Sequence, residues 1–345
     1  MTDQDKVLVT GGSGYIAGWC IVQLLRDGWQ VNTTIRDPAR EPAVRKTLAQ
    51  EVEAGDRLRF FAADLMQDAG WADAMFGCSH VLHVASPIPT TLPRNDDELV
   101  VPAREGTLRV LRAAREAGVR RVVLTSSTAA VTYGIDRRPG PAHVFTEEDW
   151  TNPAHADTSP YVRSKAIAER AAWDWHAREG GALELVAVNP PAVLGPVLGP
   201  DFSASIEIVR KLMTGEFPAC PRMGWPLVDV RDLADLHVRA MTSPSAAGQR
   251  FLAGDRVYWL KDIAAVLIAH FGSRARKVPR HGIPDWLVRL LSLFDPVTRS
   301  VVFELGMERP VSHAKAASQL GWQPRPVSRT IIDTADSLFA CGVLR

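Results

Sequence analysis

Residues 9–18 read VTGGSGYIAG, a Val-Thr pair that runs directly into a cluster of glycines. The glycines follow the first apolar run of the chain, Val7–Thr10, and precede a segment of helical period, Ile16–Asp27. Glycine-rich backbone between a strand and a helix permits a tight turn and lets a pyrophosphate approach the N–H groups that begin the helix. The stretch therefore predicts a dinucleotide-binding turn, and the competing interpretation is an ordinary flexible turn.

The spacing of the small residues favours the dinucleotide interpretation. Gly11 and Gly14 hold the first two positions of the fingerprint, and Ala17 holds the third, where Gly or Ala is accepted because the helix packs closely on the sheet. We assign Tyr15 and Ile16, the residues that follow Gly14, to the same cofactor site.

Strand-length apolar runs alternate with helical segments through the first half of the chain. The expected strands are Val7–Thr10, Gln30–Ile35, Leu58–Ala62, Val81–Ala85, Arg121–Ser126 and Leu183–Asn189. The expected helices are Ile16–Asp27, Ala43–Glu53, Trp71–Phe76, Leu99–Ala117 and Ser164–Glu179. Strands that are nearly continuous in Val, Leu and Ile are typical of parallel sheets covered on both faces. The pattern predicts an α/β fold with a doubly wound parallel sheet, the Rossmann architecture.

The residues after the second expected strand discriminate between the two nicotinamide dinucleotides. Residues 33–40 read TTIRDPAR, so Arg36 comes first, Asp37 next and Arg40 shortly after. An acidic residue at this position binds the ribose 2′-hydroxyl of NAD, whereas arginine suits the 2′-phosphate of NADP. The arginines favour NADP. Asp37 remains a competing ligand for a hydroxyl, and solvated loop charges are the simpler alternative.

The composition changes after Asn189, where residues 189–200 read NPPAVLGPVLGP. Proline and glycine at this density end the alternation of strands and helices. We therefore expect residues 1–189 to form an NADP-binding domain, with a returning segment near 225–245. Residues 190–345 are expected to form mainly a smaller substrate-binding lobe, with a further strand at Gln249–Ala253.

Tyr161 and Lys165 stand four residues apart in SPYVRSKAIAERAAW, residues 159–173, so one helix face carries both side chains. A free phenol has a pKa of about 10 and is a poor acid or base at neutral pH. A nearby ammonium group favours the phenolate and lowers that pKa, so that Tyr161 can exchange a proton with an alcohol oxygen. The alternative is a surface helix that happens to begin with an aromatic residue.

Hydroxyl side chains end the fifth expected strand in VVLTSSTAAV, residues 122–131. Open α/β sheets bind ligands at the carboxyl edge, where these residues lie. A serine there can donate a hydrogen bond to a substrate carbonyl and share the charge that develops on its oxygen. Such hydroxyls are otherwise ordinary caps, but together with the glycine turn and the Tyr-Lys pair they predict a dehydrogenase or reductase.

These motifs resemble those of the extended short-chain dehydrogenases/reductases. The likeness is closest to the branch of dihydroflavonol 4-reductase, cinnamoyl-CoA reductase and microbial NADPH-dependent aldehyde/ketone reductases. It covers nearly the whole chain, through the stretches VTGGSGYIAG, TIRDP, ADL, HVASP, EGTLRVLRAA, LTSSTAAV, YVRSK, NPPAVLGP and VDVRDLADLHVRAM.

The resemblance implies a catalytic triad of Ser127, Tyr161 and Lys165. It also implies that the cofactor site includes adenine contacts, residues along the dinucleotide cleft, and residues that flank the nicotinamide. The cofactor residues assigned in this way or from the motifs above are Gly11, Gly14, Tyr15, Ile16, Arg36, Arg40, Asp64, Leu65, Ala85, Ser126, Lys165, Pro190 and Val193.

Two departures from that branch bear on the substrate. Flavonoid enzymes carry a substrate-binding Asn five residues after the catalytic serine, where this chain has Thr132, and the cysteine-containing motif of the cinnamoyl-CoA enzymes is absent around Tyr161. Both departures count against the plant substrates. We expect Ser86, Thr132 and Trp225 to contact the substrate.

The composition points to small molecules as partners. A net charge of +1, from 40 basic and 39 acidic residues, gives no reason to expect nucleic acid or an anionic membrane. Four scattered cysteines predict no disulfide framework and favour the cytoplasm, and no signal peptide or membrane span is expected. Nine histidines lack metal-ligand spacing, so no metal is expected; His83 is assigned to a strand and His237 to a helix face. The expected solution state is a monomer or homodimer.

The sequence thus predicts reversible, NADPH-dependent reduction of a ketone or aldehyde to an alcohol, with Tyr161 as the proton donor. Alternatives on the same scaffold are an NAD(P)-dependent hydroxysteroid dehydrogenase and a nucleotide-sugar epimerase or dehydratase. An alternative of another class is a non-catalytic redox sensor that binds dinucleotide. Such sensors commonly lose the tyrosine or the lysine, and this chain retains both.

Overall fold

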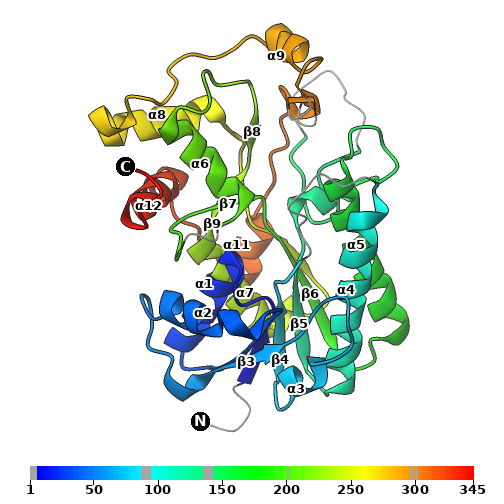
Figure 1. Ribbon diagram of the computed structural model, residues 1–345. Helices are drawn as coiled ribbons and strands as arrows, with labels where there is room; N and C mark the ends of the chain where they lie inside the picture. The colour runs from blue at the N-terminus through cyan, green and yellow to red at the C-terminus, as the bar shows by residue number, and fades with distance from the viewer. Residues whose placement is uncertain (1–5, 87–94, 135–142, 200–201, 296–297, 300–301) are drawn as a thin grey trace.

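The structure, a computed structural model, describes residues 6–86, 95–134, 143–199, 202–295, 298–299 and 302–345. A seven-stranded parallel sheet with helices on both faces forms the larger part of the molecule, and a smaller lobe lies at the upper left of Figure 1. This architecture confirms the predicted α/β class with a smaller C-terminal region.

The strand order of the sheet is β10-β6-β5-β4-β1-β2-β3. The strands are β1 (Lys6–Val9), β2 (Gln30–Ile35), β3 (Leu58–Ala62), β4 (His80–His83), β5 (Arg121–Thr125), β6 (Glu184–Asn189) and β10 (Arg250–Leu252). Strand order reverses between β1 and β4, and ligands of open α/β sheets bind outside the carboxyl ends at such a switch point. β4 ends two residues before the predicted end, because the Val84 N–H turns back to the Leu82 carbonyl at 3.1 Å.

Two buried apolar clusters cover the two faces of the sheet. On one face α1 (Tyr15–Arg26) packs on α7 (Val230–Thr242), and on the other α4 (Asp97–Glu116) packs on α5 (Pro160–Glu179). The remaining described helices of this part are α2 (Glu41–Leu48), α3 (Trp71–Met75) and α11 (Ala314–Leu320). α2 ends five residues before the predicted end at Glu53, where the chain continues as a turn. The short 3-10 helices of the chain are η1 (Pro38–Arg40), η2 (Gly55–Arg57), η3 (Thr128–Ala130), η4 (Pro244–Ala246), η5 (Gly272–Ala275) and η6 (Val302–Glu304).

α5 begins four residues before the predicted start. The Ser159 hydroxyl accepts a hydrogen bond from the Val162 N–H at 3.3 Å, and Pro160 occupies the first helical position, where its missing N–H is not needed. The cap therefore places Tyr161 and Lys165 in the first two turns of the helix.

The smaller lobe has its own buried apolar cluster. Its elements are β7 (Ala192–Leu194), α6 (Ala204–Thr214), β8 (Gly224–Trp225), β9 (Leu227–Asp229), β11 (Tyr258–Trp259), α8 (Leu260–Phe271), α9 (Asp285–Leu291) and α12 (Val327–Ala340). Between these elements the chain returns to the larger part, because α7 packs on α1 and β10 pairs with β6. In the described part of the chain, no helix combines the length and apolarity that a membrane span needs.

The turn between β1 and α1 is packed too closely for larger side chains. Gly11 has a φ of 74°, and a Cβ atom added there would lie 3.0 Å from the Cβ of Ala85. A Cβ atom on Gly12 would lie 2.2 Å from Oγ1 of Thr33, a hydroxyl that is itself held by the Val9 carbonyl at 2.8 Å. Steric contact with β2 and β4 therefore explains the glycines of this turn.

We expect Gly12→Ala to destabilise the fold because the new methyl group has no space beside Thr33. Overpacking of this kind costs about 1–3 kcal/mol of unfolding free energy, measured by urea denaturation. Gly199→Ala is the matched control, since its Cβ would lie 3.6 Å from the nearest atoms of Thr47, an ordinary contact. Equal stability of the two variants would contradict this account of the turn.

Two histidines are buried in the sheet region, as predicted in a strand and on a helix. The His83 ring lies 2.9 Å from the Thr10 hydroxyl, and His237 lies 2.7 Å from the Thr125 hydroxyl. Burial lowers the pKa of His83 to about 3, with Lys165 contributing, and burial lowers the pKa of His237 to about 4. Among the described residues, no group of three or more His, Cys, Asp or Glu side chains could hold a metal ion.

These pKa shifts predict a loss of stability in mild acid. Because the folded protein binds the two ring protons more weakly than the unfolded chain does, stability is complete above pH 6.5 and decreases as the pH falls toward 4. Each histidine contributes up to about 1.4 kcal/mol per pH unit, measurable by urea denaturation between pH 7 and 5. Titration of the His83 or His237 ring resonances between pH 8 and 5 would show that the pKa values are not lowered.

Candidate active site

The N-terminus of α1 has the properties of an anion site. Gly14 caps the helix without a side-chain hydrogen bond, and the first turn, which begins with Tyr15 and Ile16, contains no acidic residue. The first N–H groups of a helix have no intrahelical acceptor, and the helix dipole attracts negative charge to them. Glycines carry no side chain that would cover these N–H groups, so the turn could hold a dinucleotide pyrophosphate.

The segment after β2 presents two arginines beside a carboxylate that is already engaged. Arg36 follows the strand and Arg40 ends η1, and both residues are exposed. The Asp37 carboxylate caps η1 by accepting the Ala39 N–H at 3.0 Å. One oxygen of the Asp37 carboxylate, the competing ligand for a ribose hydroxyl, therefore already accepts a hydrogen bond within the protein.

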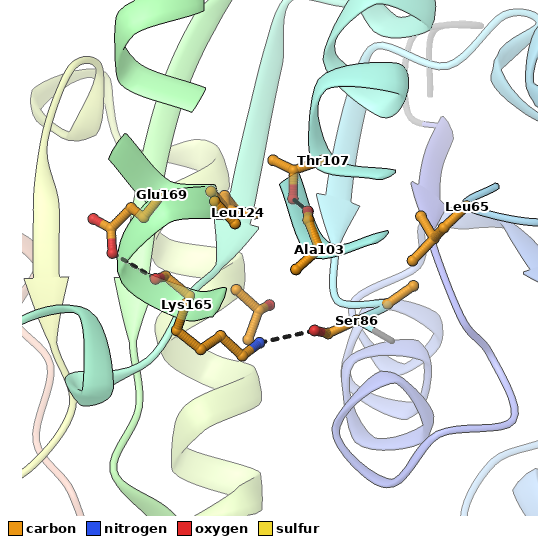
Figure 2. A pocket seen from close by; sticks show the side chains of 11 residues that line it. Leu65, Ser86, Ala103, Thr107, Leu124, Lys165 and Glu169 are labelled. Carbon is orange, nitrogen blue, oxygen red and sulfur yellow. Dashed lines mark hydrogen bonds between the residues drawn. The ribbon is translucent and has the colours of Figure 1, made fainter. Parts of the chain in front are cut away.

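A cavity lies at the carboxyl edge of the sheet, between α4 and α5 (Figure 2). Its lining residues are Leu65, Ala85, Ser86, Ala103, Thr107, Leu124, Thr125, Ser126, Lys165, Ala168 and Glu169. The cavity brings together residues that the sequence assigned to the adenine, the dinucleotide cleft and catalysis. Asp64, which precedes the lining residue Leu65, does not itself line the cavity, and its carboxylate accepts the Met66 N–H at 2.8 Å.

The three predicted catalytic residues come from the end of β5 and the start of α5. Tyr161 is 43% exposed, and Nζ of Lys165 lies 5.8 Å from the centre of the Tyr161 ring. Lys165 also donates to the Ser86 hydroxyl at 2.9 Å (Figure 2). Ser127 is buried at the start of η3, where its hydroxyl accepts the Ala129 N–H at 3.1 Å.

The hydroxyl hydrogen of Ser127 has only a long contact, 3.5 Å to the Pro190 carbonyl. Because the Thr128 N–H donates to the same carbonyl at 3.0 Å, that acceptor is already engaged. Ser127 can therefore turn its hydrogen toward a ligand at small energetic cost. Val193, the other residue assigned to the nicotinamide, is buried in β7 and pairs with Val228 of β9.

A second tyrosine, Tyr133, lies near Tyr161. Its hydroxyl donates to Glu304 at 2.8 Å, and the Arg309 guanidinium lies 4.0 Å above its ring. Burial and the Glu304 carboxylate raise the pKa of Tyr133 far above its ordinary value. Tyr133 therefore stays protonated and engaged, whereas Tyr161 presents an exposed phenol beside an ammonium group.

The three residues assigned to the substrate are in different environments. Ser86 lines the cavity and accepts from Lys165. Thr132 is buried, and its hydroxyl donates to the Thr128 carbonyl at 3.1 Å. Trp225 is half-buried in β8 of the smaller lobe and packs against that lobe's core.

Sequence reasoning missed a group of buried polar side chains next to this site: Glu169, Asn189 and Arg250. Glu169 was detectable in principle, because it lies one helical turn after Lys165 and falls among apolar residues of α5. Arg250 carries no local signal, since only the pairing of β10 with β6 brings it there.

Comparison with known proteins places this geometry in a family. The model described as "NAD dependent epimerase/dehydratase family" matches residues 7–254. A cinnamoyl-CoA reductase 1 of Petunia hybrida is 35% identical over 340 residues, which are 98% of this chain and 93% of that protein. A dihydroflavonol 4-reductase of Zea mays is 33% identical over 273 residues, 77% of this chain and 74% of that protein.

Among solved structures, the yeast methylglyoxal/isovaleraldehyde reductase Gre2 complexed with NADPH is similar over the whole chain. It has a TM-score of 0.80 and 25% identity, and the match covers 98% of this chain and 99% of that chain. These findings confirm the family predicted from the motifs. The chain belongs to the NAD dependent epimerase/dehydratase family, as an extended short-chain dehydrogenase/reductase of the NAD(P)-dependent reductase branch that includes the dihydroflavonol and cinnamoyl-CoA reductases.

Proposed function

We propose that this protein reduces the carbonyl group of a small ketone or aldehyde to an alcohol, with NADPH as the cofactor. The observation that carries the proposal is the pairing of an exposed phenol, Tyr161, with the Lys165 ammonium at the edge of the cavity. NADPH, when bound, supplies the hydride that reduces the carbonyl carbon.

The residues of the chain then have distinct roles. Tyr161 donates the proton to the carbonyl oxygen, and the positive charge of Lys165 favours the phenolate that remains. The Ser127 hydroxyl donates to the same oxygen and stabilises the charge that develops on it. Lys165 would also hold the cofactor ribose. Retention of both Tyr161 and Lys165 argues against a non-catalytic sensor.

The choice of NADPH rests on the segment after β2. Arg36 and Arg40 are exposed there and can contact a 2′-phosphate, whereas Asp37 caps η1. The structure of Gre2, which is similar over the whole chain, contains NADPH. Both observations support NADP rather than NAD as the cofactor of this protein.

The substrate is proposed to bind between the cavity and the smaller lobe. Ser86 supports this location because its hydroxyl lines the cavity beside Lys165. Trp225 would contribute an apolar wall from the lobe side. The buried Thr132 hydroxyl is engaged by the backbone, so an interaction of Thr132 with substrate would have to come from another part of its side chain.

We expect the unmodified protein to bind NADPH more tightly than NADH. Replacing Arg36 and Arg40 by Gln should weaken NADPH binding by about 1–3 kcal/mol for each charge-assisted hydrogen bond that the substitution removes, with little change for NADH. Fluorescence titration of both cofactors measures the effect. Arg112→Gln, at an exposed position of α4, is the control and should leave both affinities unchanged. Equal affinity of the unmodified protein for NADPH and NADH would contradict the assignment.

Tyr161→Phe removes the proposed proton donor and keeps the ring. We expect turnover of a reactive carbonyl compound to fall by about 10²–10⁴-fold, while NADPH affinity is retained. Lys165→Ala should lower both turnover and NADPH affinity, and Ser127→Ala should mainly lower turnover. The readout is NADPH oxidation with a panel of aldehydes and ketones.

Tyr133→Phe is the matched control for the loss of a phenol hydroxyl. It should lower stability by about 1–3 kcal/mol, because Glu304 loses a buried hydrogen bond, but should leave turnover near normal. Near-normal turnover of Tyr161→Phe would rule out the catalytic assignment.

A further inference from the structure

One buried carboxylate joins the catalytic helix to the ends of the strands. Glu169 has a fully buried side chain and lies one helical turn beyond Lys165 in α5. Its Oε2 accepts hydrogen bonds from the Ser126 hydroxyl at 2.5 Å and from Nδ2 of Asn189 at 2.7 Å. Its Oε1 accepts from Nε of Arg250 at 2.7 Å. A single side chain therefore connects α5, β5, β6 and β10.

Figure 2 shows how α5 presents its two charged side chains. Lys165 extends across the cavity toward Ser86, whereas Glu169, on the same helix face and also lining the cavity, turns its carboxylate away from Ser86. The charges thus face two different sets of partners. The Lys165 ammonium points into the proposed reaction site, and the Glu169 carboxylate binds Ser126, Asn189 and Arg250 beside that site.

The contacts of Glu169 determine what the two serines can do. Because Ser126 donates its hydrogen to the carboxylate, it has no hydrogen left for a substrate. Asn189, held by the same carboxylate, also donates to the backbone carbonyl of Ser127 at 3.0 Å. The hydroxyl of Ser127 is therefore the one of the pair that remains able to bind the substrate oxygen.

Arg250, the cationic partner of Glu169, is also buried. Arg250 donates to the carbonyls of Glu147 at 2.7 Å and Asp149 at 3.0 Å, and its guanidinium lies 3.7 Å above the Trp150 ring. Removing two charges from water is costly, and a buried ion pair gains little net stability over well-packed apolar side chains. Stability alone therefore does not account for a buried Glu-Arg pair at this place.

We propose that Glu169 is a positioning residue for the carbonyl reduction. It accepts the hydrogen of the Ser126 hydroxyl and, through Asn189, holds the backbone of Ser127 in place. Because Glu169 and Lys165 belong to the same helix, both serines keep a fixed position relative to Lys165. This inference rests on the proposed function, because it describes how the groups that act on the substrate oxygen are kept in place.

The first test is Glu169→Gln. An amide has one acceptor oxygen where the carboxylate has two. In the single variant the Arg250 cation, left without its counter-charge, competes with Ser126 and Asn189 for that oxygen. We expect kcat per NADPH-binding site to fall at least tenfold, with the NADPH dissociation constant within threefold of normal. A purely structural role predicts a lower melting temperature and an unchanged kcat per binding site.

Two double variants, in which both residues of the Glu169–Arg250 ion pair are replaced by neutral ones, distinguish a positioning role from an effect of the unpaired charge. In Glu169→Gln/Arg250→Gln the amide oxygen can still accept from Ser126 and Asn189, whereas Glu169→Met/Arg250→Met offers no acceptor. We expect kcat of the Gln pair to recover to within about threefold of the unmodified protein and kcat of the Met pair to stay at least tenfold lower. Equal kcat values for the two pairs would overturn the proposal. If the Met pair does not fold, recovery of kcat in the Gln pair relative to Glu169→Gln decides the question.

Glu184→Gln is the control for breaking an ion pair. Glu184 accepts from Arg121 at 2.7 Å at the opposite end of β5 and β6, away from the cavity. It should lower stability without changing kcat. A loss of kcat comparable to that of Glu169→Gln would show that general destabilisation explains both.

Crystal structures of Glu169→Gln and of the Gln pair give a readout that does not depend on turnover. We expect the Ser126 and Ser127 side chains to move in the single variant and to return in the pair; unmoved serines would refute the positioning role. If the unmodified protein oxidises no NADPH with any carbonyl compound, the proposed function fails, and these structures still decide whether Glu169 positions the serines.

Discussion

A parallel sheet starts every strand from the same edge, and this constraint organises the molecule. Each strand must be followed by a crossover, which here covers one or other face of the sheet, and all carboxyl ends therefore meet at the opposite edge. The glycine turn after β1, the arginines after β2, the cavity residue Ala85 after β4 and the serines after β5 are far apart in sequence but share this edge.

Close packing at the point between β1 and β4 where the strand order reverses then determines how a ligand can approach the backbone. The turn at Gly11 and Gly12 lies against Ala85 and Thr33, and the N–H groups of both glycines donate to Thr34, which holds the turn on the sheet. The N-terminus of α1 is consequently held rigidly beside the carboxyl edge. A rigid set of N–H groups binds an anion without first having to become ordered.

Burial separates side chains of the same type into different roles. Tyr133 is enclosed with Glu304 and Arg309, which keeps its phenol protonated, whereas Tyr161 is exposed beside Lys165. The Ser126 hydroxyl donates to a buried carboxylate, whereas the hydrogen of the Ser127 hydroxyl has only a long contact to a carbonyl. In both pairs the chemistry of the residue is the same, and its surroundings decide what it can do.

Local patterns of apolar residues predicted the strands and helices of the first half of the chain and their order. Apolar runs marked the first six strands to within one or two residues, and the spacing of Gly11, Gly14 and Ala17 indicated the turn. The positions of Tyr161 and Lys165 on one helix face also followed from spacing alone. Two helix ends were predicted wrongly: α2 ends at Leu48 rather than Glu53, and the Ser159 cap with Pro160 begins α5 earlier than the apolar period indicates.

Only the tertiary structure decided which polar residues meet. Arg250 reaches Glu169 because β10 joins the sheet beside β6, and Glu304 reaches Tyr133 from a segment 171 residues away in the chain. No periodicity encodes such contacts, since they depend on where separate elements pack and on which side chains that packing removes from water. The sequence could therefore indicate Glu169 through its place on α5, but it could not predict which side chains Glu169 contacts.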